Sequence, residues 1–188
     1  MFMVVFAVVV ALVVLVVLYV VFLQRSLVHL DELRANAMSQ IGVQMNSRWD
    51  GLTALADVMK GYAEHERTAL REIIAQRAPL GRTASAEEIQ QQEGLLTSAL
   101  GWLIAVSENY PELKANTLYQ TTMENIAAAE DKVRMSRMVY NDTVTRINRA
   151  VRMFPASLFA SMLGFGPHEY LKEPDGKTEM PSMRDGGR

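Results

Sequence analysis

The densest group of side chains that could bind a metal or move a proton is the stretch GYAEHE, residues 61–66. It holds His65 between Glu64 and Glu66, residue types found in metal and acid/base sites. Successive residues of a helix point about 100° apart, so three neighbours cannot converge on one ion, and helical ligands need a spacing of three or four. We therefore expect GYAEHE to be a turn of helix with a partly exposed His65. A metal or acid/base role for His65 is the less favoured alternative.

The composition removes several other kinds of chemistry. The chain has no cysteine, which excludes disulfides, thiolate metal sites and cysteine nucleophiles. It contains neither an HExxH motif nor a glycine-rich phosphate-binding loop. The 19 basic and 21 acidic side chains are spread along the chain and leave a net charge of −2, which does not favour a nucleic-acid surface. We expect no cofactor, no metal and no nucleic-acid partner.

A second set of polar residues interrupts the apolar stripes of the expected helices: Arg48, Glu66, Glu130 and Arg137. A charge at a packing position costs several kcal/mol unless it finds a partner. Positions along the helices predict two inter-helix pairs, Arg48 with Glu108 and Glu66 with Arg137, and a partly buried Glu130. The alternative is that these side chains extend to the surface from a narrow seam. Their expected role is to fix helix register, because catalysis would also need a pocket.

The chain opens with MFMVVFAVVVALVVLVVLYVVFL, residues 1–23, which carries no charged side chain. A helix of this length spans about 34 Å, enough for a bilayer core, and predicts a single-pass anchor. A secretory signal peptide is the alternative, but that class has a basic leader, a shorter apolar core and a small-residue cleavage site. Arg25 and Arg34 follow the segment, so the positive-inside rule favours a cytoplasmic C-terminal domain on a bacterial membrane.

Helical periodicity continues after the anchor. Apolar residues recur at threes and fours from Gln24 to Arg77, which predicts one long helix running on from the membrane. Pro79 and Gly81 end it, and Ser85 with Glu88 predicts a capping box for a second helix, residues 86–109. A third helix should follow the cap at Asn116 and end at Phe154-Pro155.

No stretch shows the alternation typical of strands, so the predicted fold class is all-α. We expect the transmembrane helix to continue into an antiparallel, up-down-up bundle of three or four long helices. The expected domains are an anchor at residues 1–23, a bundle at 24–165 and a mostly disordered tail at 166–188 that is rich in Pro, Gly and charge.

The segment ASLFASMLGF, residues 156–165, is amphipathic, with Leu158, Phe159, Met162 and Phe165 on one side. In an up-down-up bundle the third helix travels away from the membrane, so this segment should lie at the far tip. Capping the bundle tip is the favoured interpretation. Membrane binding is the alternative, which the distance from the anchored membrane argues against.

Four blocks of the chain together carry a family resemblance: WDGLTALADVMKGYAEHE, LIAVSENYPELKAN, AEDKVRMSRMVYNDTVTRIN and FPASLFASMLGF. In order and spacing they resemble the LemA family of bacterial membrane proteins over roughly residues 25–170. The chain departs from the family at residues 51–55, where GLTAL stands in place of an Ile-Pro-Asn-Leu run. The resemblance implies a transmembrane anchor, a helical bundle and no established enzymatic activity, with no catalytic residues to carry over. Because a relative takes part in forming magnetosome membranes, it also implies a role in membrane organisation.

These observations favour a membrane-anchored, non-catalytic scaffold or interaction protein, with membrane lipid and other proteins as partners and self-assembly as one form of partnership. Self-assembly could use the valine-rich anchors or apolar residues left exposed on the bundle. Trp49 and Trp102 are candidates for such exposed residues, although a core position is the favoured expectation for both. A lipid- or small-ligand-binding bundle is the alternative function, and an enzyme is the least favoured.

Overall fold

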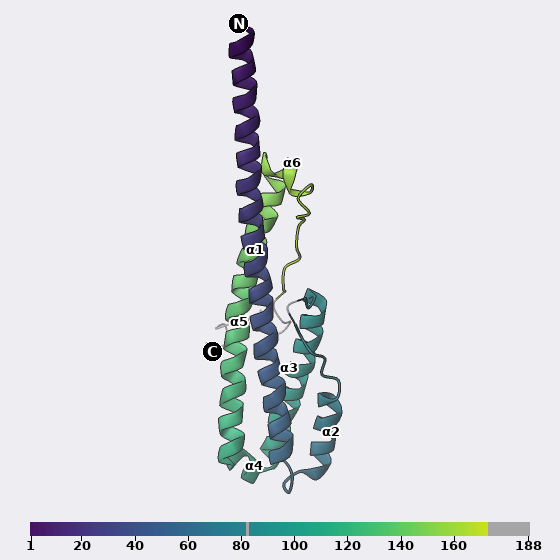
Figure 1. The fold of residues 1–188 in the computed structure, drawn as a ribbon. Helices are drawn as coiled ribbons and strands as arrows, with labels where there is room; N and C mark the ends of the chain where they lie inside the picture. The colour runs from purple at the N-terminus through teal and green to yellow at the C-terminus, as the bar shows by residue number, and fades with distance from the viewer. Residues whose placement is uncertain (82, 173–188) are drawn as a thin grey trace, which may run out of the picture. The chain divides into compact units, whose positions relative to one another are not determined.

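The computed structural model describes residues 1–81 and 83–172, in which all regular elements are helical (Figure 1). The helices are α1 (Phe2–Val58), α2 (Glu64–Ile74), α3 (Ala86–Asn109), α4 (Pro111–Ala115), α5 (Thr117–Arg152) and α6 (Ala156–Ala160). This confirms the all-α, long-helix fold. The described residues divide into unit 1, made of Met1–Ala37 and Met138–Tyr170, and unit 2, made of Met38–Arg137 with Leu171 and Lys172. Helices α1 and α5 contribute to both units.

Helix α1 is continuous from the apolar segment onward, as expected for an anchor that runs on into the bundle. Its most apolar window has a mean hydropathy of 3.5 and none of that window is buried inside the protein. Among the described helices, α1 has the length and composition needed to cross a membrane. An exposed valine-rich helix is unfavourable in water and favourable in lipid, because there its apolar side chains face hydrocarbon and its backbone is bonded internally.

The single helix expected for residues 24–77 is wrong, because α1 ends at Val58 and α2 begins at Glu64. Gly61 lies between them with φ +93°, a left-handed conformation that side chains other than glycine rarely adopt. The backbone N–H of Ala63 donates to the carbonyl of Met59, which closes the turn. Gly61 therefore reverses the chain, where the sequence pattern predicted a continuous helix.

The later helix boundaries agree with the sequence signals. Ser85 Oγ accepts from the backbone N–H of Glu88 at 3.1 Å, and the Glu88 carboxylate accepts from the backbone N–H of Ser85 at 2.7 Å. This capping box starts α3 at the predicted residue. Asn116 Oδ1 accepts from the backbone N–H of Leu118 at 2.9 Å and caps the start of α5. Both caps act within four residues, which is why they could be recognised in the sequence.

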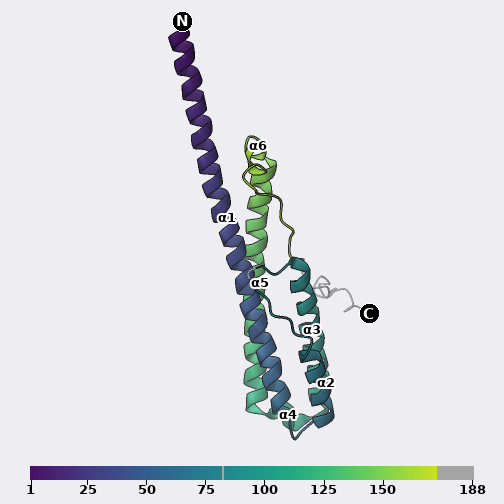
Figure 2. The same ribbon diagram turned by 45° about the vertical axis from the view of Figure 1, so that its right-hand side comes forward.

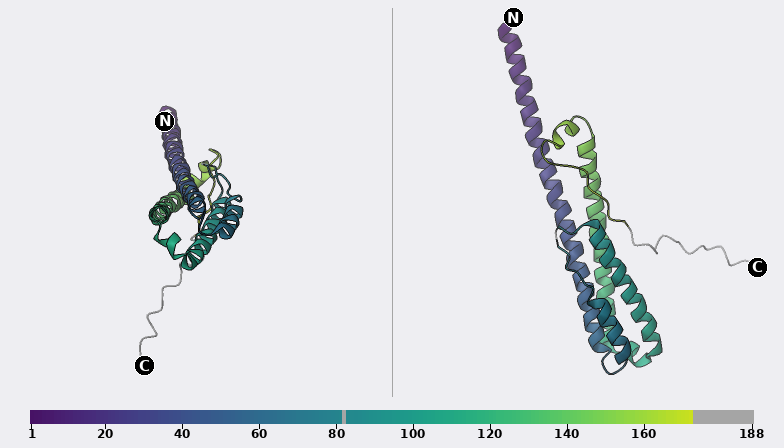
Figure 3. Two further views of the ribbon diagram at one scale, coloured as in Figure 1. Left: turned by 90° about the horizontal axis from the view of Figure 1, so that it is seen from below. Right: turned by 90° about the vertical axis from the view of Figure 1, so that its right-hand side faces the viewer.

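Unit 2 is an antiparallel bundle of α2, α3 and the adjoining parts of α1 and α5, in which α2 lies beside α3 (Figure 3). Its core consists of large apolar side chains that are fully buried: Ile41, Met45, Trp49, Leu52, Leu55, Met59, Leu70, Ile89, Leu96 and Leu103. Helices α1 and α5 approach closely at Gly51, where an added Cβ would lie 2.6 Å from Ile126 Cγ1. Glycine in place of a larger residue at this position therefore sets the spacing of the two helices.

In unit 1, the end of α5 and helix α6 pack on α1 at the end of its apolar segment (Figure 2). The buried centre of this contact is formed by Leu23, Leu27, Ala156 and Ala160. The expected far-tip position of residues 156–165 is therefore wrong. Because the turn at Gly61 adds one more reversal, α5 runs back toward the apolar end of α1 instead of away from it.

The first part of the expected tail is held along α5. Asn148 forms two bonds with the backbone of His168: its Nδ2 donates to the His168 carbonyl at 2.9 Å, and its Oδ1 accepts from the His168 N–H at 2.8 Å. Tyr140 Oη donates to the carbonyl of Glu169 at 3.3 Å. Residues 166–170 thus form an extended segment fixed to α5. The rest of the expected tail, residues 173–188, lies outside the described residues.

Candidate functional site

The candidate metal or acid/base group Glu64-His65-Glu66 lies at the start of α2, where Glu64 and His65 are exposed and Glu66 is half-buried. Arg67 Nε donates to Glu64 at 2.9 Å, and this hydrogen bond holds the pKa of the Glu64 carboxyl below its usual value. Tyr110 Oη donates to Glu66 at 2.9 Å, which raises the pKa of the tyrosine. Among the described residues, no three His, Asp or Glu side chains are placed to hold a metal ion. The bond between Glu66 and Tyr110 therefore connects α2 to the C-terminal end of α3.

A cluster of four charged side chains, Arg48, Glu93, Glu130 and Arg137, lies inside unit 2, and we call it the charge cluster. It joins three helices, because Arg48 is on α1, Glu93 on α3, and Glu130 and Arg137 on α5. Arg48 Nη2 lies 3.6 Å from Glu130 Oε2, and Arg137 Nη2 forms an ion pair with Glu93 Oε2. Both arginines are buried, as their positions on the apolar stripes predicted.

The partners differ from those expected. Arg48 pairs with Glu130 while Glu108 is exposed, and Glu66 bonds to Tyr110 instead of Arg137. The expected levels assumed one unbroken first helix, and the reversal at Gly61 changes which residues face each other.

The sequence reasoning missed Glu93, the buried partner of Arg137. A signal for it existed, because Glu93 lies four residues after Ile89 and three before Leu96, both fully buried. That spacing places Glu93 on the inward face of α3.

Burial dominates the electrostatics of the charge cluster. Desolvation lowers the pKa of Arg48, while the carboxylates of Glu130 and Glu93 act in the opposite direction. Arg48 Nε and Nη1 have no hydrogen-bond partner among the described residues, and the same holds for Arg137 Nε and Trp49 Nε1. Each unbonded buried donor costs about 1–3 kcal/mol. The cluster is thus a costly arrangement, and its two ion pairs join α5 to α1 and α5 to α3.

The cluster consists of two guanidinium groups and two carboxylates, which pair with one another so that the four charges sum to zero. What the arrangement can do is hold α1, α3 and α5 in one register.

A buried glutamine that the sequence reasoning missed fixes the connection between α2 and α3. Gln92 Oε1 accepts from the backbone N–H of Ala78 at 3.0 Å, and Gln92 Nε2 donates to the carbonyl of Gln76 at 3.4 Å. These bonds satisfy backbone groups of an irregular segment. Arg77 adds a 2.7 Å contact from its Nη1 to Asp50 Oδ1 on α1.

The amphipathic segment of unit 1 presents its apolar residues in two directions. Phe159 and Phe165 pack against the buried cluster of Leu23, Leu27, Ala156 and Ala160, and the Phe159 ring meets Tyr19 edge-on with centroids 6.2 Å apart. Leu158 and Met162 are exposed. A left-handed Gly164 ends the segment: the N–H of Phe165 bonds back to the carbonyl of Ala160, as in a Schellman motif. The expected single apolar side of this segment is therefore divided between α1 and the surface.

Comparison with known sequences gives the family. The sequence pattern of the LemA family matches residues 37–184. The chain belongs to the LemA family. Two similar relatives are "Magnetosome protein MamQ 2" and "Magnetosome protein MamQ 1" of Paramagnetospirillum magneticum, each 30% identical over 100 residues. "Magnetosome protein MamQ" of Magnetospirillum gryphiswaldense is 29% identical over 100 residues. Each match covers 53% of this chain and 37% of the relative, so the shared region is about a third of those proteins.

Membership of the LemA family confirms the resemblance seen in the four sequence blocks. The family match includes the whole charge cluster and the segment that packs on α1, and it begins after the apolar part of the LemA protein's first helix. The relatives are named as magnetosome proteins, and α1 of this chain has the length and composition needed to cross a membrane.

Proposed function

We propose that this LemA-family protein is a membrane-anchored, non-catalytic helical scaffold that binds other proteins, second copies of itself included, and contributes to membrane organisation. The observation that carries the proposal is α1, a single helix whose first part is apolar and exposed while its later part supplies the core of unit 2. A helix built this way ties a packed domain to lipid without a flexible linker. The names of the MamQ relatives support a role at a membrane-bound structure.

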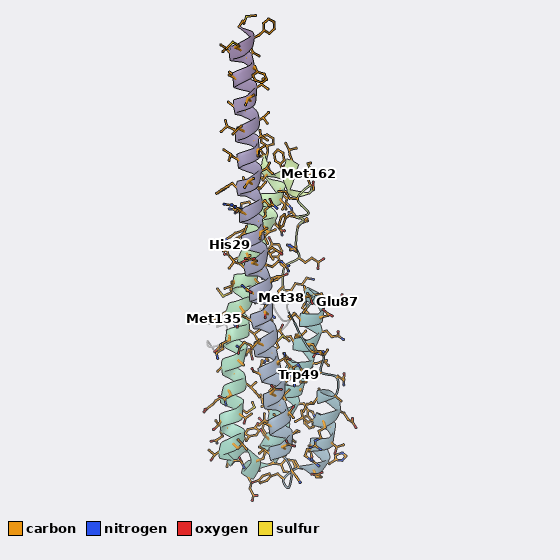
Figure 4. All side chains as sticks on the ribbon, viewed as in Figure 1. His29, Met38, Trp49, Glu87, Met135 and Met162 are labelled. Atoms are coloured by element: carbon orange, nitrogen blue, oxygen red, sulfur yellow. The ribbon has the colours of Figure 1, made fainter. Side chains whose placement is uncertain are left out.

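The interior of the protein supports a non-catalytic role. Trp49 is fully buried in unit 2, where it packs in the core and cannot be offered to a partner (Figure 4). The buried charges pair with one another across helices. An enzyme needs convergent reactive groups that are open to a substrate, whereas these charged groups form ion pairs with one another between helices.

Exposed apolar side chains on α5 support binding of other proteins. Met135, Met138 and Val139 are exposed and stand at positions i, i+3 and i+4, so they share one face of the helix. Figure 4 shows Met135 pointing away from the neighbouring helices. Methionine-rich faces suit protein contacts because the side chain adapts its shape. The proposed orientation, with the bundle in the cytoplasm, follows from Arg25 after the apolar segment.

Mass measurement of the full chain in lipid nanodiscs tests the scaffold proposal. We expect multiples of the 21.0 kDa chain, or a copurifying protein after mild crosslinking in cells. The variant Met138→Lys should shift the distribution toward single chains, because a charge on the apolar face opposes its burial. Lys132→Glu, at an exposed position on the same helix, is the matched control. A strict monomer with no captured partner would contradict the proposal.

A further inference from the structure

Four large apolar side chains point away from unit 1 where α5 ends and α6 begins. They are Met153, Phe154, Leu158 and Met162, with exposed fractions of 57%, 79%, 59% and 82%. Helix α5 ends at Arg152 and the chain turns at Pro155, which leaves Phe154 exposed. We call residues 153–162 the corner. An exposed apolar surface of this kind marks a site of interaction.

The position of the corner identifies what faces it. Its inner side packs on Tyr19, Leu23 and Leu27 of α1, the last part of the apolar segment and the turn after it. Tyr19 lies four residues before the end of that segment, which is about 6 Å along the helix axis. In Figure 4, Met162 lies nearer the N-terminal end of α1 than His29 does. The corner therefore reaches the level at which the apolar segment meets its polar continuation.

The chemistry at this level fits a lipid interface. The Tyr19 ring of α1 meets the Phe159 ring of the corner, and Phe22 lies within one helical turn of Tyr19, so aromatic rings gather here as in the aromatic belts of membrane proteins. Arg149 and Arg152 end α5 and are exposed, and Arg25 is exposed on α1 just after the apolar segment. Cations beside an apolar, aromatic surface are the features that bind a helix to anionic lipid headgroups.

We propose that the corner is inserted into the interface of the same bilayer that α1 crosses, with Arg25, Arg149 and Arg152 at the level of anionic headgroups. The inference rests on the anchor proposed above. It gives unit 1 a second lipid contact, so that α1 cannot swing or rotate freely about its own axis. A bilayer is favoured over a second protein copy as the occupant, because the corner packs on Tyr19 and Leu23, which belong to the same apolar segment whose other side chains, Phe22 among them, are exposed.

Lipid contact can be measured residue by residue, because the chain has no cysteine of its own. Single-cysteine variants of the full chain would carry the fluorophore NBD in vesicles of phosphatidylethanolamine and phosphatidylglycerol. Doxyl-labelled lipids then quench only a label that touches lipid. The corner is probed by Phe154→Cys and Met162→Cys, the anchor by Leu12→Cys, and an exposed position of α4 by Glu112→Cys. Circular dichroism checks that each variant keeps its helices.

We expect strong quenching at residues 12, 154 and 162 and little at residue 112. If residue 12 is quenched while residues 154 and 162 behave like residue 112, the corner inference is refuted and the anchor stands. A blue-shifted but unquenched label at residue 154 means that protein covers the corner, which also refutes it. Absence of quenching at residue 12 refutes the anchor and the inference with it. Replacing Arg149 and Arg152 by Gln should reduce quenching at residue 154, and Arg134→Gln is the matched control.

Discussion

Removing one side of the buried ion pair between α3 and α5 should destabilise the protein strongly. The side chains of Arg137 and Glu93 are each only 8% exposed, so water cannot solvate the group that remains. In Arg137→Met, the Glu93 carboxylate must stay buried without its partner or take up a proton. Breaking a buried pair in this way costs about 3–5 kcal/mol. We expect the free energy of unfolding to fall by about that amount.

Removing both charges should have a much smaller effect. In the double variant Arg137→Met with Glu93→Met, no unpaired charge remains and the new side chains are apolar and similar in length. Such replacements are commonly neutral or stabilise by about 1–4 kcal/mol. We therefore expect the double variant to be far more stable than Arg137→Met alone. The difference isolates the burial of an unpaired charge as the cause.

Urea unfolding of the full chain in nanodiscs, followed by circular dichroism and by the fluorescence of buried Trp49, measures these free energies. The control is Arg146→Met, which breaks the exposed pair of Arg146 with Asp142, where the side chains are 64% and 62% exposed. Exposed pairs contribute about 0–1 kcal/mol. Burial of an unpaired charge is refuted as the cause if Arg137→Met costs no more than this control, or if the double variant is as unstable as Arg137→Met.

Two further predictions concern helix spacing and pH. Gly51→Ala should lower the free energy of unfolding by about 1–3 kcal/mol, because the new Cβ would clash with Ile126. Gly94→Ala on α3 should raise it by about 0.5–1 kcal/mol, because its Cβ meets open space and alanine favours a helix. Urea unfolding of the two variants measures both changes. Burial lowers the pKa of His168 below its usual 6.5, with Arg34 adding to the effect and Asp31 opposing it. Because the folded state favours neutral His168, the attachment of residues 166–170 should be stable above pH 6.5 and weaken as pH falls below it. Amide hydrogen exchange across this range, corrected for its intrinsic pH dependence, should show faster opening at low pH, and His168→Gln should abolish the change.

Signals that act over a few residues were sufficient for much of the fold. The capping box of Ser85 and Glu88 and the cap at Asn116 located the starts of α3 and α5, because each cap bonds backbone groups within its own turn. Apolar spacing also identified Arg48 and Arg137 as buried charges, since the face of a helix on which a residue lies follows from its position alone.

The partners of those charges could not be read in the same way. Whether Gly61 weakens a helix or reverses the chain depends on the packing around it, and the structure shows a left-handed turn at that position. With one more reversal, Arg48 meets Glu130, Arg137 meets Glu93, and α5 returns toward the apolar end of α1. The apolar pattern of the sequence does not show how many times the chain reverses direction.

The sequence by itself determined the apolar N-terminal segment, the helical class, the family and the burial of Arg48 and Arg137, because these depend on composition and on short-range periodicity. Only the tertiary structure decided which buried charges meet and that residues 153–162 lie beside the end of the apolar segment. The physical reason is that a contact between distant segments depends on the direction and register of every helix between them.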